Sequence, residues 1–246
     1  MKRLNVLVAC EYSGRVRDAF AALGHNAMSC DLLPTEAPGN HYQGDVRDVL
    51  YKGWDLVVAH PPCTFLSVAG NRWFNVERYG QKAITRLKDR EQAIAFFKLF
   101  TDLECEMVAI ENPIGCMSKT YQKPSQVIHP YMFGDPERKA TCLWLKGLPA
   151  LQATNVVEPT IVKYKNGKGT DSPWHLDTLK LPAEERRKAR SLTFQGIADA
   201  MDLESFNKKW EAWANCWQHQ QAKVEELQRR NQMLNDNISI TQQTPT

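Results

Sequence analysis

The chain has 246 residues, of which 43% are hydrophobic and 24% charged, with 13 glycines, 13 prolines and a formal net charge of +3. This composition is ordinary for a globular protein and excludes collagen-like, low-complexity and wholly disordered chains. No apolar run approaches the roughly 18 to 20 residues that a membrane-spanning helix needs, so we expect no membrane partner. The length fits one α/β domain with a small appendage.

The seven cysteines give no sign of a shared structural role. They stand at positions 10, 30, 63, 105, 116, 142 and 216. The number is odd and no Cys-x-x-Cys pair occurs, so we expect neither a disulfide framework nor a zinc knuckle, and no other metal site. Residues Met1–Asn5 lead directly into a strand-like segment without an export signal. These features predict reduced thiols and a cytoplasmic location.

The first half of the chain alternates short apolar runs with helical periodicity. The expected strands are 6–9, 27–30, 56–59 and 107–110, and the expected helices are 15–23 and 83–104, with a short helical turn after Gly44-Asp45. This alternation predicts right-handed crossovers and a doubly wound, mostly parallel sheet. Ligands bind such sheets beyond the carboxyl ends of the strands. Residues 10–14, 31, 45, 60–63 and 111–113 all fall there.

The second half is less regular. We expect a structured loop over 118–134, a strand over 141–145 and a helix over 197–210. Residues 162–190 look irregular and basic, because eight lysines and arginines stand against four acidic residues. The predicted organisation is a core at 1–147, a small basic segment at 148–190, a return to the core at 191–210, a C-terminal helix at 211–241 and a disordered end at 242–246.

The C-terminal helix carries a heptad pattern. Its seam steps by alternating three and four residues through Trp210, Trp213, Trp217, Gln220, Val224, Leu227, Asn231, Leu234 and Ile238. Asn231 falls at an a position, where asparagine favours two strands. The pattern is open to two interpretations: a homodimer through this helix, or an amphipathic helix that packs on its own domain.

Cys63 is the first candidate for chemistry. It follows a predicted buried strand and two prolines, Pro61 and Pro62, which hold the backbone extended. At that edge of the sheet a helix N-terminus or a nearby cation would lower the pKa of the thiol. We therefore expect Cys63 to act as a nucleophile.

Glu111 ends a second buried strand and is followed by Asn112 and Pro113. Desolvation is expected to raise the pKa of this carboxyl, so that it holds or donates a proton near neutral pH. Two structural alternatives are that Glu111 caps the next turn and that Asn112 only orients the loop. A thiolate beside a protonated carboxyl can add to C6 of a pyrimidine, which makes C5 nucleophilic toward a methyl group.

The residues around Cys63 resemble a known motif. Pro61-Pro62-Cys63-Thr64-Phe65-Leu66-Ser67-Val68-Ala69-Gly70 is similar to the Pro-Pro-Cys-Gln-x-Phe-Ser-x-Ala-Gly signature of the DNA (cytosine-5-)-methyltransferases. Glu111-Asn112-Pro113 resembles their Glu-Asn-Val, in the same order along the chain. The likeness covers about residues 6–117, and the compact form is similar to enzymes often found in bacteriophages. It implies a Rossmann-like fold of the class I S-adenosylmethionine-dependent methyltransferase type, with a small irregular insertion and a C-terminal helix.

The resemblance also implies roles for the catalytic and substrate-binding residues. Cys63 would be the C6 nucleophile and Glu111 the N3 acid, with Asn112 beside it and Arg138 near cytosine O2. The residues that would face DNA are Pro62, Thr64, Ser67, Gly70 and Arg72. Residues 67–72 would form a mobile loop that closes over a flipped base.

The methyl donor implied by the resemblance is S-adenosylmethionine. The residues that would hold it are Cys10, Glu11, Tyr12, Ser13, Gly14, Asp31, Asp45 and Pro61. Residues 10–14 stand where the family has Phe-x-Gly-x-Gly, and only Gly14 keeps the glycine pattern. Asp31 would hold the ribose hydroxyls and Asp45 would lie near the adenine amine. Gln195-Gly196-Ile197-Ala198 would close the pocket in place of Gly-Asn-x-Val.

Two departures from the family motifs lie near the catalytic residues, and three alternatives to DNA cytosine-5 methylation remain open. Thr64 replaces the family's glutamine, and Pro113 replaces its valine. Only about 148–190 is left for a target-recognition region, so we expect short or degenerate specificity, or help from a second subunit, in any DNA modification or restriction–modification role. One alternative is an amino methyltransferase for N4 of cytosine or N6 of adenine, which needs no thiol. Another is a catalytically silent nucleic-acid-binding protein that keeps the fold. RNA also remains open as the partner in place of DNA.

Overall fold

The computed structural model describes residues 3–164, 169–202, 223 and 229–230. The chain divides into two compact units, residues 1–203 and 204–246. The heptad seam at 210–238, the predicted disordered end at 242–246 and the second half of the predicted helix 197–210 lie, apart from single positions, outside the described residues. The homodimer through the C-terminal helix therefore stays a prediction.

A seven-stranded sheet forms the centre of the first unit. Its strands are β1 (Asn5–Ala9), β2 (Asn26–Asp31), β3 (His41–Gln43), β4 (Leu56–Ala59), β5 (Met107–Pro113), β6 (Gln126–Ile128) and β7 (Thr141–Lys146). Their order is β3-β2-β1-β4-β5-β7-β6, and only β7 runs antiparallel to its neighbours. This confirms the predicted α/β class with a mostly parallel sheet, which is compatible with a Rossmann-like fold.

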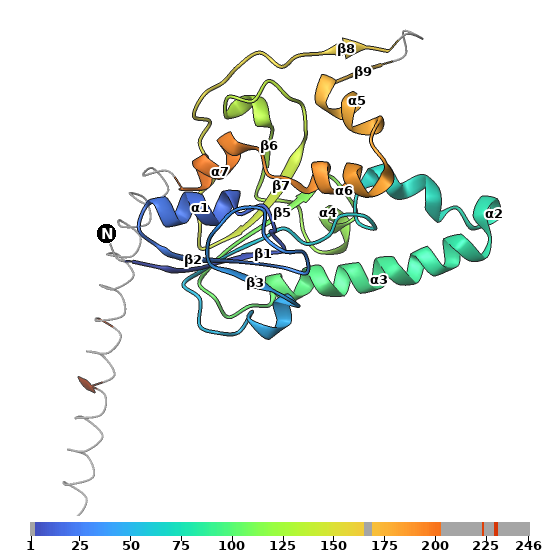
Figure 1. Cartoon of the computed structure of the whole chain (residues 1–246). Helices are drawn as coiled ribbons and strands as arrows, with labels where there is room; N and C mark the ends of the chain where they lie inside the picture. The colour runs from blue at the N-terminus through green and yellow to red at the C-terminus, as the bar shows by residue number, and fades with distance from the viewer. Residues whose placement is uncertain (1–2, 165–168, 203–222, 224–228, 231–246) are drawn as a thin grey trace, which may run out of the picture. The chain divides into compact units, whose positions relative to one another are not determined.

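Helices cover both faces of this sheet. α1 (Arg15–Ala22) and α7 (Gln195–Asp202) pack together on one face, and α3 (Gln81–Thr101) covers the other (Figure 1). Leu7, Val57 and Ile110 of the strands are buried in one core cluster with Phe97 and Phe100 of α3. The apolar runs read from the sequence are therefore strands that are buried on both faces.

The remaining elements are short. They are η1 (Val46–Asp48), η2 (Val68–Phe74), α2 (Val76–Tyr79), α4 (Met117–Thr120), η3 (Pro130–Met132), β8 (Val162–Lys163), β9 (Thr170–Asp171), α5 (Pro173–Leu179) and α6 (Ala183–Ser191). The helical turn expected after Gly44-Asp45 is confirmed as η1. Of the helices that the structure describes, none has both the length and the apolar character required to cross a membrane.

Two expectations from the sequence were wrong. Residues 118–134 are not a loop, because they hold β6, which pairs with β7. Residues 162–190 are not irregular, because they hold the β8–β9 hairpin and helices α5 and α6. β6 has only three residues in a polar context, and α6 buries none of its side chains, so neither has an apolar pattern to reveal it.

The strand order places one crevice at a defined point. From β1 the chain moves outward to β2 and β3, and then returns to β4 on the other side of β1. A doubly wound sheet binds its ligand where the strand order reverses in this way, outside the carboxyl ends of the strands. Here that point lies between the loop after β1 and the loop after β4.

Candidate functional site

The loop after β4 and the end of β5 bring Cys63 and Glu111 together. β4 and β5 are parallel neighbours in which Ala59 is aligned with Ile110, so the next residues of both strands leave the sheet at one edge. The negative charge of Glu111 acts directly on the Cys63 thiol. The two side chains that the sequence singled out therefore belong to one site.

Asn112 fixes the turn that carries Cys63. Its side chain is buried, and its amide Nδ2 donates a hydrogen bond of 2.7 Å to the Pro61 carbonyl. The Cys63 carbonyl then accepts the amides of Leu66 and Ser67, both at 3.0 Å. Asn112 thus orients the loop, as one of the two structural alternatives expected.

The Cys63 thiol differs from the expectation in its acidity. The side chain is accessible to solvent. Burial by the surrounding protein nevertheless raises the pKa of the thiol, and the Glu111 carboxylate raises it further, while Lys139 offsets part of the rise. The expected lowering of the pKa is therefore wrong, because a carboxylate faces the sulfur as well as a cation.

Glu111 also titrates differently from the expectation. Burial favours its protonated form, but His60 Nδ1 lies 3.1 Å from Oε2, and this hydrogen bond together with the charges of Lys139 and His60 outweighs burial. The pKa of Glu111 is consequently lowered, and the predicted rise is wrong. Since the carboxylate is ionised near neutral pH, it accepts the hydrogen bond and His60 donates it.

Lys139 is a cation of this site that the sequence analysis did not name, and the role of Arg138 near cytosine O2 stays a prediction. Arg138 is exposed and donates to the Thr170 hydroxyl at 3.4 Å. The charge of Lys139 reaches both Cys63 and Glu111, and its ammonium donates to the Arg190 carbonyl at 3.1 Å. Sequence reasoning missed His60 and Lys139, although His60 directly precedes Pro61 and Lys139 directly follows the arginine that was chosen.

The predicted substrate loop is tightly held in this structure. Arg86 and Arg90 of α3 donate to the carbonyls of Thr64 (2.9 Å) and Phe65 (2.8 Å). Ser67 forms a β-bridge with Gly115, where a Cβ would lie only 2.1 Å from the Leu66 carbonyl oxygen. Gly70 is buried and Arg72 is exposed within η2. The described loop is therefore ordered by contacts to two other segments.

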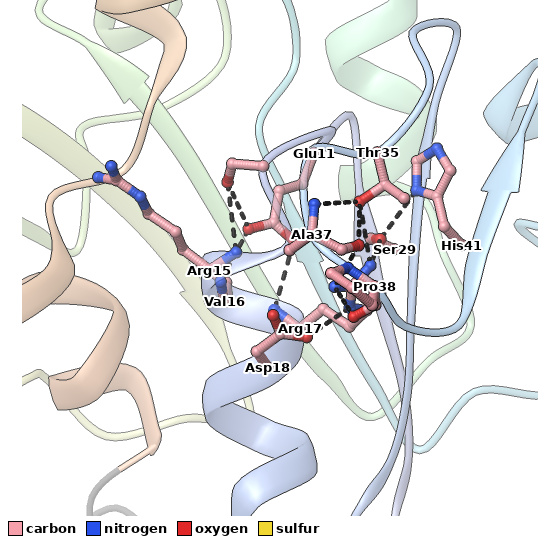
Figure 2. Close-up of polar contacts among 11 residues, drawn as sticks. Glu11, Arg15, Val16, Arg17, Asp18, Ser29, Thr35, Ala37, Pro38 and His41 are labelled. Carbon is pink, nitrogen blue, oxygen red and sulfur yellow. Dashed lines mark hydrogen bonds and ion pairs between the residues drawn. The ribbon is translucent and has the colours of Figure 1, made fainter.

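Glu11 closes the N-terminus of α1. Its buried carboxylate accepts the amides of Val16 (2.7 Å) and Arg17 (3.3 Å) and the Ser13 hydroxyl (3.1 Å), and Ser13 in turn accepts the amide of Arg15 at 3.3 Å (Figure 2). A helix N-terminus normally offers these amides to an anion such as a phosphate. Here a side chain of the same chain already occupies them. Glu11 and Ser13, expected to hold the cofactor, are engaged in this cap.

Arg17 joins the loop after β2 to α1. It is 1% exposed and donates to the Ser29 and Thr35 hydroxyls and to the carbonyls of Ala37 and Pro38, at 3.0–3.2 Å (Figure 2). Gly14 has a φ of 78°, and a Cβ there would lie 2.4 Å from the guanidinium. The one glycine that survives from the family pattern is therefore required by Arg17 as well as by its left-handed backbone.

Helix α6 lies over the loops after β1 and β2. The Tyr12 hydroxyl donates to the Lys188 carbonyl at 2.9 Å, and the Lys188 ammonium forms a 2.6 Å ion pair with Glu36. Just beyond α6, the Thr193 carbonyl accepts from Arg15 at 2.8 Å. Tyr12, expected to pack on the cofactor, is buried beneath this cover. Part of the segment predicted to contact DNA therefore also encloses the crevice.

Two acidic side chains lie beside the crevice and act on Cys10. Cys10 has a φ of 59°, unusual for a residue other than glycine, and burial followed by the charge of Asp31 raises the pKa of its thiol. The Asp31 carboxylate accepts the Leu33 amide at 2.9 Å. Asp45 is held by Arg47, whose side chain and amide lower the pKa of that carboxyl to about 2. Both acids lie at the expected strand ends, and Asp45 is already paired.

The segment 195–198 forms the first turn of α7. The Gly196 amide donates to Asp135 at 3.3 Å, and a Cβ on Gly196 would lie 1.9 Å from the Phe133 carbonyl oxygen. Gly196 thus allows a close backbone approach to residues 133–135.

An open groove of about 800 Å³ adjoins the Cys63 loop. It is lined by Pro62, Thr64 and Phe65 from the loop, by one side of α3, and by Arg47 and Arg187 from two other segments. Among the described residues, no three His, Cys, Asp or Glu side chains are grouped as they would be to hold a metal ion.

Neither the models of known protein families nor the curated proteins contain a match to this chain. The functional argument therefore depends on the geometry of the site and on the resemblance of its motifs.

Proposed function

We propose that this protein methylates C5 of cytosine in DNA, with S-adenosylmethionine as the methyl donor. The observation that carries the proposal is the meeting of Cys63 and Glu111 at the ends of adjacent strands, close enough for the carboxylate to raise the pKa of the thiol. Addition to C6 of a pyrimidine requires a nucleophilic sulfur and a carboxyl group that both reach the same ring.

The chemistry divides between two side chains of this site. The Cys63 thiolate forms a bond to C6, and a proton at N3 neutralises the charge that moves into the ring, which leaves an enamine that is nucleophilic at C5. After methyl transfer, C5 loses its proton to solvent, the C5–C6 double bond returns, the bond between C6 and sulfur breaks, and N3 returns its proton to Glu111. Cys63 is then a thiolate again, so it acts as a covalent catalyst.

The proton at N3 reaches the base through Glu111. Because the pKa of this carboxyl is lowered, its proton is not resident near neutral pH before the base arrives. His60 is a proton donor within hydrogen-bond distance of Oε2. Entry of a base removes water from Glu111, which raises its affinity for a proton, so the carboxyl takes up a proton from solvent as the base arrives and passes it to N3. The hydrogen bond from His60 holds the carboxyl in position for this transfer.

The crevice after β1 fits S-adenosylmethionine better than a dinucleotide. The Glu11 carboxylate takes the α1 amides on which a dinucleotide would place its pyrophosphate. The charge of Asp31, which acts on Cys10, suits a ligand with a positive sulfonium and ammonium group. When bound, this cofactor supplies the electrophilic methyl group. Asp31 and the backbone of residues 10–12 would hold it.

Trapping on 5-fluorocytosine tests the proposal directly. When S-adenosylmethionine is present, methyl transfer to the analogue leaves fluorine at C5 in place of the hydrogen that is normally lost as a proton. Elimination is then blocked, so the protein should remain covalently attached to an oligonucleotide that carries the analogue. Mass spectrometry should place the adduct on Cys63, and Cys63→Ser should form none. An adduct on another residue, or methylation that survives Cys63→Ser, would contradict C5 chemistry and favour an amino methyltransferase. Absence of S-adenosylmethionine binding in calorimetry would favour a silent binding protein.

A further inference from the structure

The segment that follows the Cys63 loop forms a helical arm with an aromatic surface. We define the arm as η2, α2 and the first half of α3, residues 68–90; α2 and this end of α3 extend outward from the sheet (Figure 1). An open hollow of about 570 Å³ on the arm is lined by Phe65, Trp73, Tyr79, Lys82, Thr85, Arg86 and Asp89. The larger groove beside Cys63 is also lined by Phe65 and Asp89, so the two hollows adjoin.

Two aromatic rings on the arm stand together within reach of solvent. The centroids of Trp73 and Tyr79 are 5.0 Å apart, and Trp73 is 42% exposed. Each ring carries a guanidinium, with Arg72 at 4.6 Å from the centroid of Trp73 and Arg78 at 5.4 Å from that of Tyr79. A single exposed ring carries little information, but adjoining exposed rings flanked by cations form a patch that marks a candidate binding surface.

The arm is held firmly to the loop that carries the nucleophile. Arg86 donates to the Thr64 carbonyl at 2.9 Å, and its guanidinium lies 4.8 Å and 5.0 Å from the ring centroids of Phe65 and Phe74. Arg90 joins the Phe65 carbonyl to Asn71. A ligand on Trp73 would therefore be placed in a fixed relation to the residue after Cys63.

The charge of the arm indicates the class of ligand. Between residues 72 and 90 there are six lysines and arginines and two acidic residues, which gives this stretch a net charge of +4 against +3 for the whole chain. Lysines and arginines alone would bind the phosphate backbone of any nucleic acid. Exposed aromatic rings stack on a base only when one face of that base is uncovered, and an intact duplex offers no such face.

We infer that the Trp73–Tyr79 surface is a stacking site for an unpaired base of a single-stranded nucleic acid, with Arg72, Arg78 and Lys82 against its backbone. The inference rests on the proposed function for the claim that this strand is the substrate, and it makes a strand with unpaired bases beside the target the preferred form. The site lies outside the residues that carry the chemistry.

Fluorescence anisotropy of the full chain with labelled oligo-dT tests this, since a strand without cytosine measures binding apart from methylation. Oligo-dT should bind more tightly than a duplex of equal length. Trp73→Ala and Tyr79→Ala should each weaken single-strand binding by roughly 5- to 150-fold and leave duplex binding unchanged, while Trp73→Phe retains most of it. Lys82→Gln should reduce the salt slope by about 0.7. Tyr51→Ala, at a ring that is 69% exposed on the turn before β4, is the matched control and should change nothing.

Equal affinity for single strand and duplex, or single-strand binding that survives both alanine variants, would overturn the inference. So would a Trp73→Ala variant that changes the light-scattering mass and leaves nucleic-acid binding intact, because the arm would then bind a second copy of the chain. An adduct on 5-fluorocytosine without a role for Trp73 removes the stacking site and keeps the proposed function. Loss of single-strand binding in Trp73→Ala without any adduct on 5-fluorocytosine would keep the stacking site and remove the proposed function.

Discussion

His60 Nδ1 lies 3.1 Å from Glu111 Oε2, which joins the residue before the Pro61–Cys63 turn to the end of the neighbouring strand. This contact, with the charge of Lys139, keeps the buried carboxyl ionised, and the ionised carboxyl in turn raises the pKa of the Cys63 thiol. The Glu111 carboxyl and the Cys63 thiol therefore do not titrate independently. A change at either of their neighbours should be seen in both.

Lys139→Met should shift the pH dependence of methylation upward. The Lys139 charge lowers the pKa of Cys63, and the reaction needs the thiolate, so kcat/KM rises with pH until the thiol is ionised. Without this cation the rise moves to higher pH, and the rate at neutral pH falls roughly tenfold for each unit of the shift. Arg138→Gln, at the adjacent exposed cation, is the control and should leave the profile in place. An unshifted profile for Lys139→Met would show that its charge does not act on the sulfur.

Glu111→Gln should change how stability depends on pH. The pKa of Glu111 in the folded protein lies below its ordinary value of 4.5. The unfolded chain therefore binds the proton more readily, and the carboxylate stabilises the fold above pH 4.5 and loses that contribution as pH falls through the folded pKa. Thermal melting of the wild type should fall more steeply below pH 4.5 than that of Glu111→Gln. The exposed Glu184→Gln on α6 should melt with the wild-type slope, and parallel slopes for all three would contradict the lowered pKa.

Much of this site could be predicted from the sequence because it is local to strand ends. Cys63, Glu111 and Asn112 each follow an apolar run within a few residues, and parallel pairing of β4 with β5 brings those ends together. Lys139 could not be placed in this way, because it reaches the site only through the antiparallel return of β7 beside β5. Both pKa directions were wrong because the deciding neighbours come from other segments. For Glu111 only burial was considered, and for Cys63 a cation or helix N-terminus was considered without burial and the facing carboxylate.

The fold shows the same division between local and long-range signals. β1, β4 and β5 have apolar runs that are buried on both faces, so they could be read directly. α6 has charged residues on all sides, and it is held in position by contacts with Tyr12 and Glu36, which lie far away in the sequence. α5 had a local signal that the sequence analysis did not use, a Ser172 cap followed by Pro173 at the first helical position.

Asn112→Ala should loosen the turn that presents Cys63. The variant leaves the buried Pro61 carbonyl without its 2.7 Å hydrogen bond, which costs about 1–3 kcal/mol of unfolding free energy. Urea unfolding measures this loss, and the rate of adduct formation on 5-fluorocytosine should fall as well, because the thiol is no longer held in place. Asn26→Ala removes an exposed hydrogen bond to Asn5 and is the control. If adduct formation proceeds at the wild-type rate despite the lost stability, Asn112 is structural only.

Lys188→Met should speed the release of S-adenosylmethionine. Lys188 forms the ion pair with Glu36 and lies 5.3 Å from the centroid of the Tyr12 ring, so it holds α6 over the loops after β1 and β2. Both partners of the pair are about half exposed, so the fold should lose little stability. The cover should nevertheless open more often, and stopped-flow measurement should show faster cofactor dissociation with a nearly unchanged association rate.

The control for this variant is Lys180→Met, which breaks a similarly short and more exposed ion pair with Asp177 on α5. It should leave dissociation at the wild-type rate. High salt should narrow the difference between Lys188→Met and the wild type, because screening weakens the wild-type pair. Equal dissociation rates for both variants at low salt would mean that α6 does not retain the cofactor, and that the contact between Lys188 and Glu36 only fixes the loop after β2.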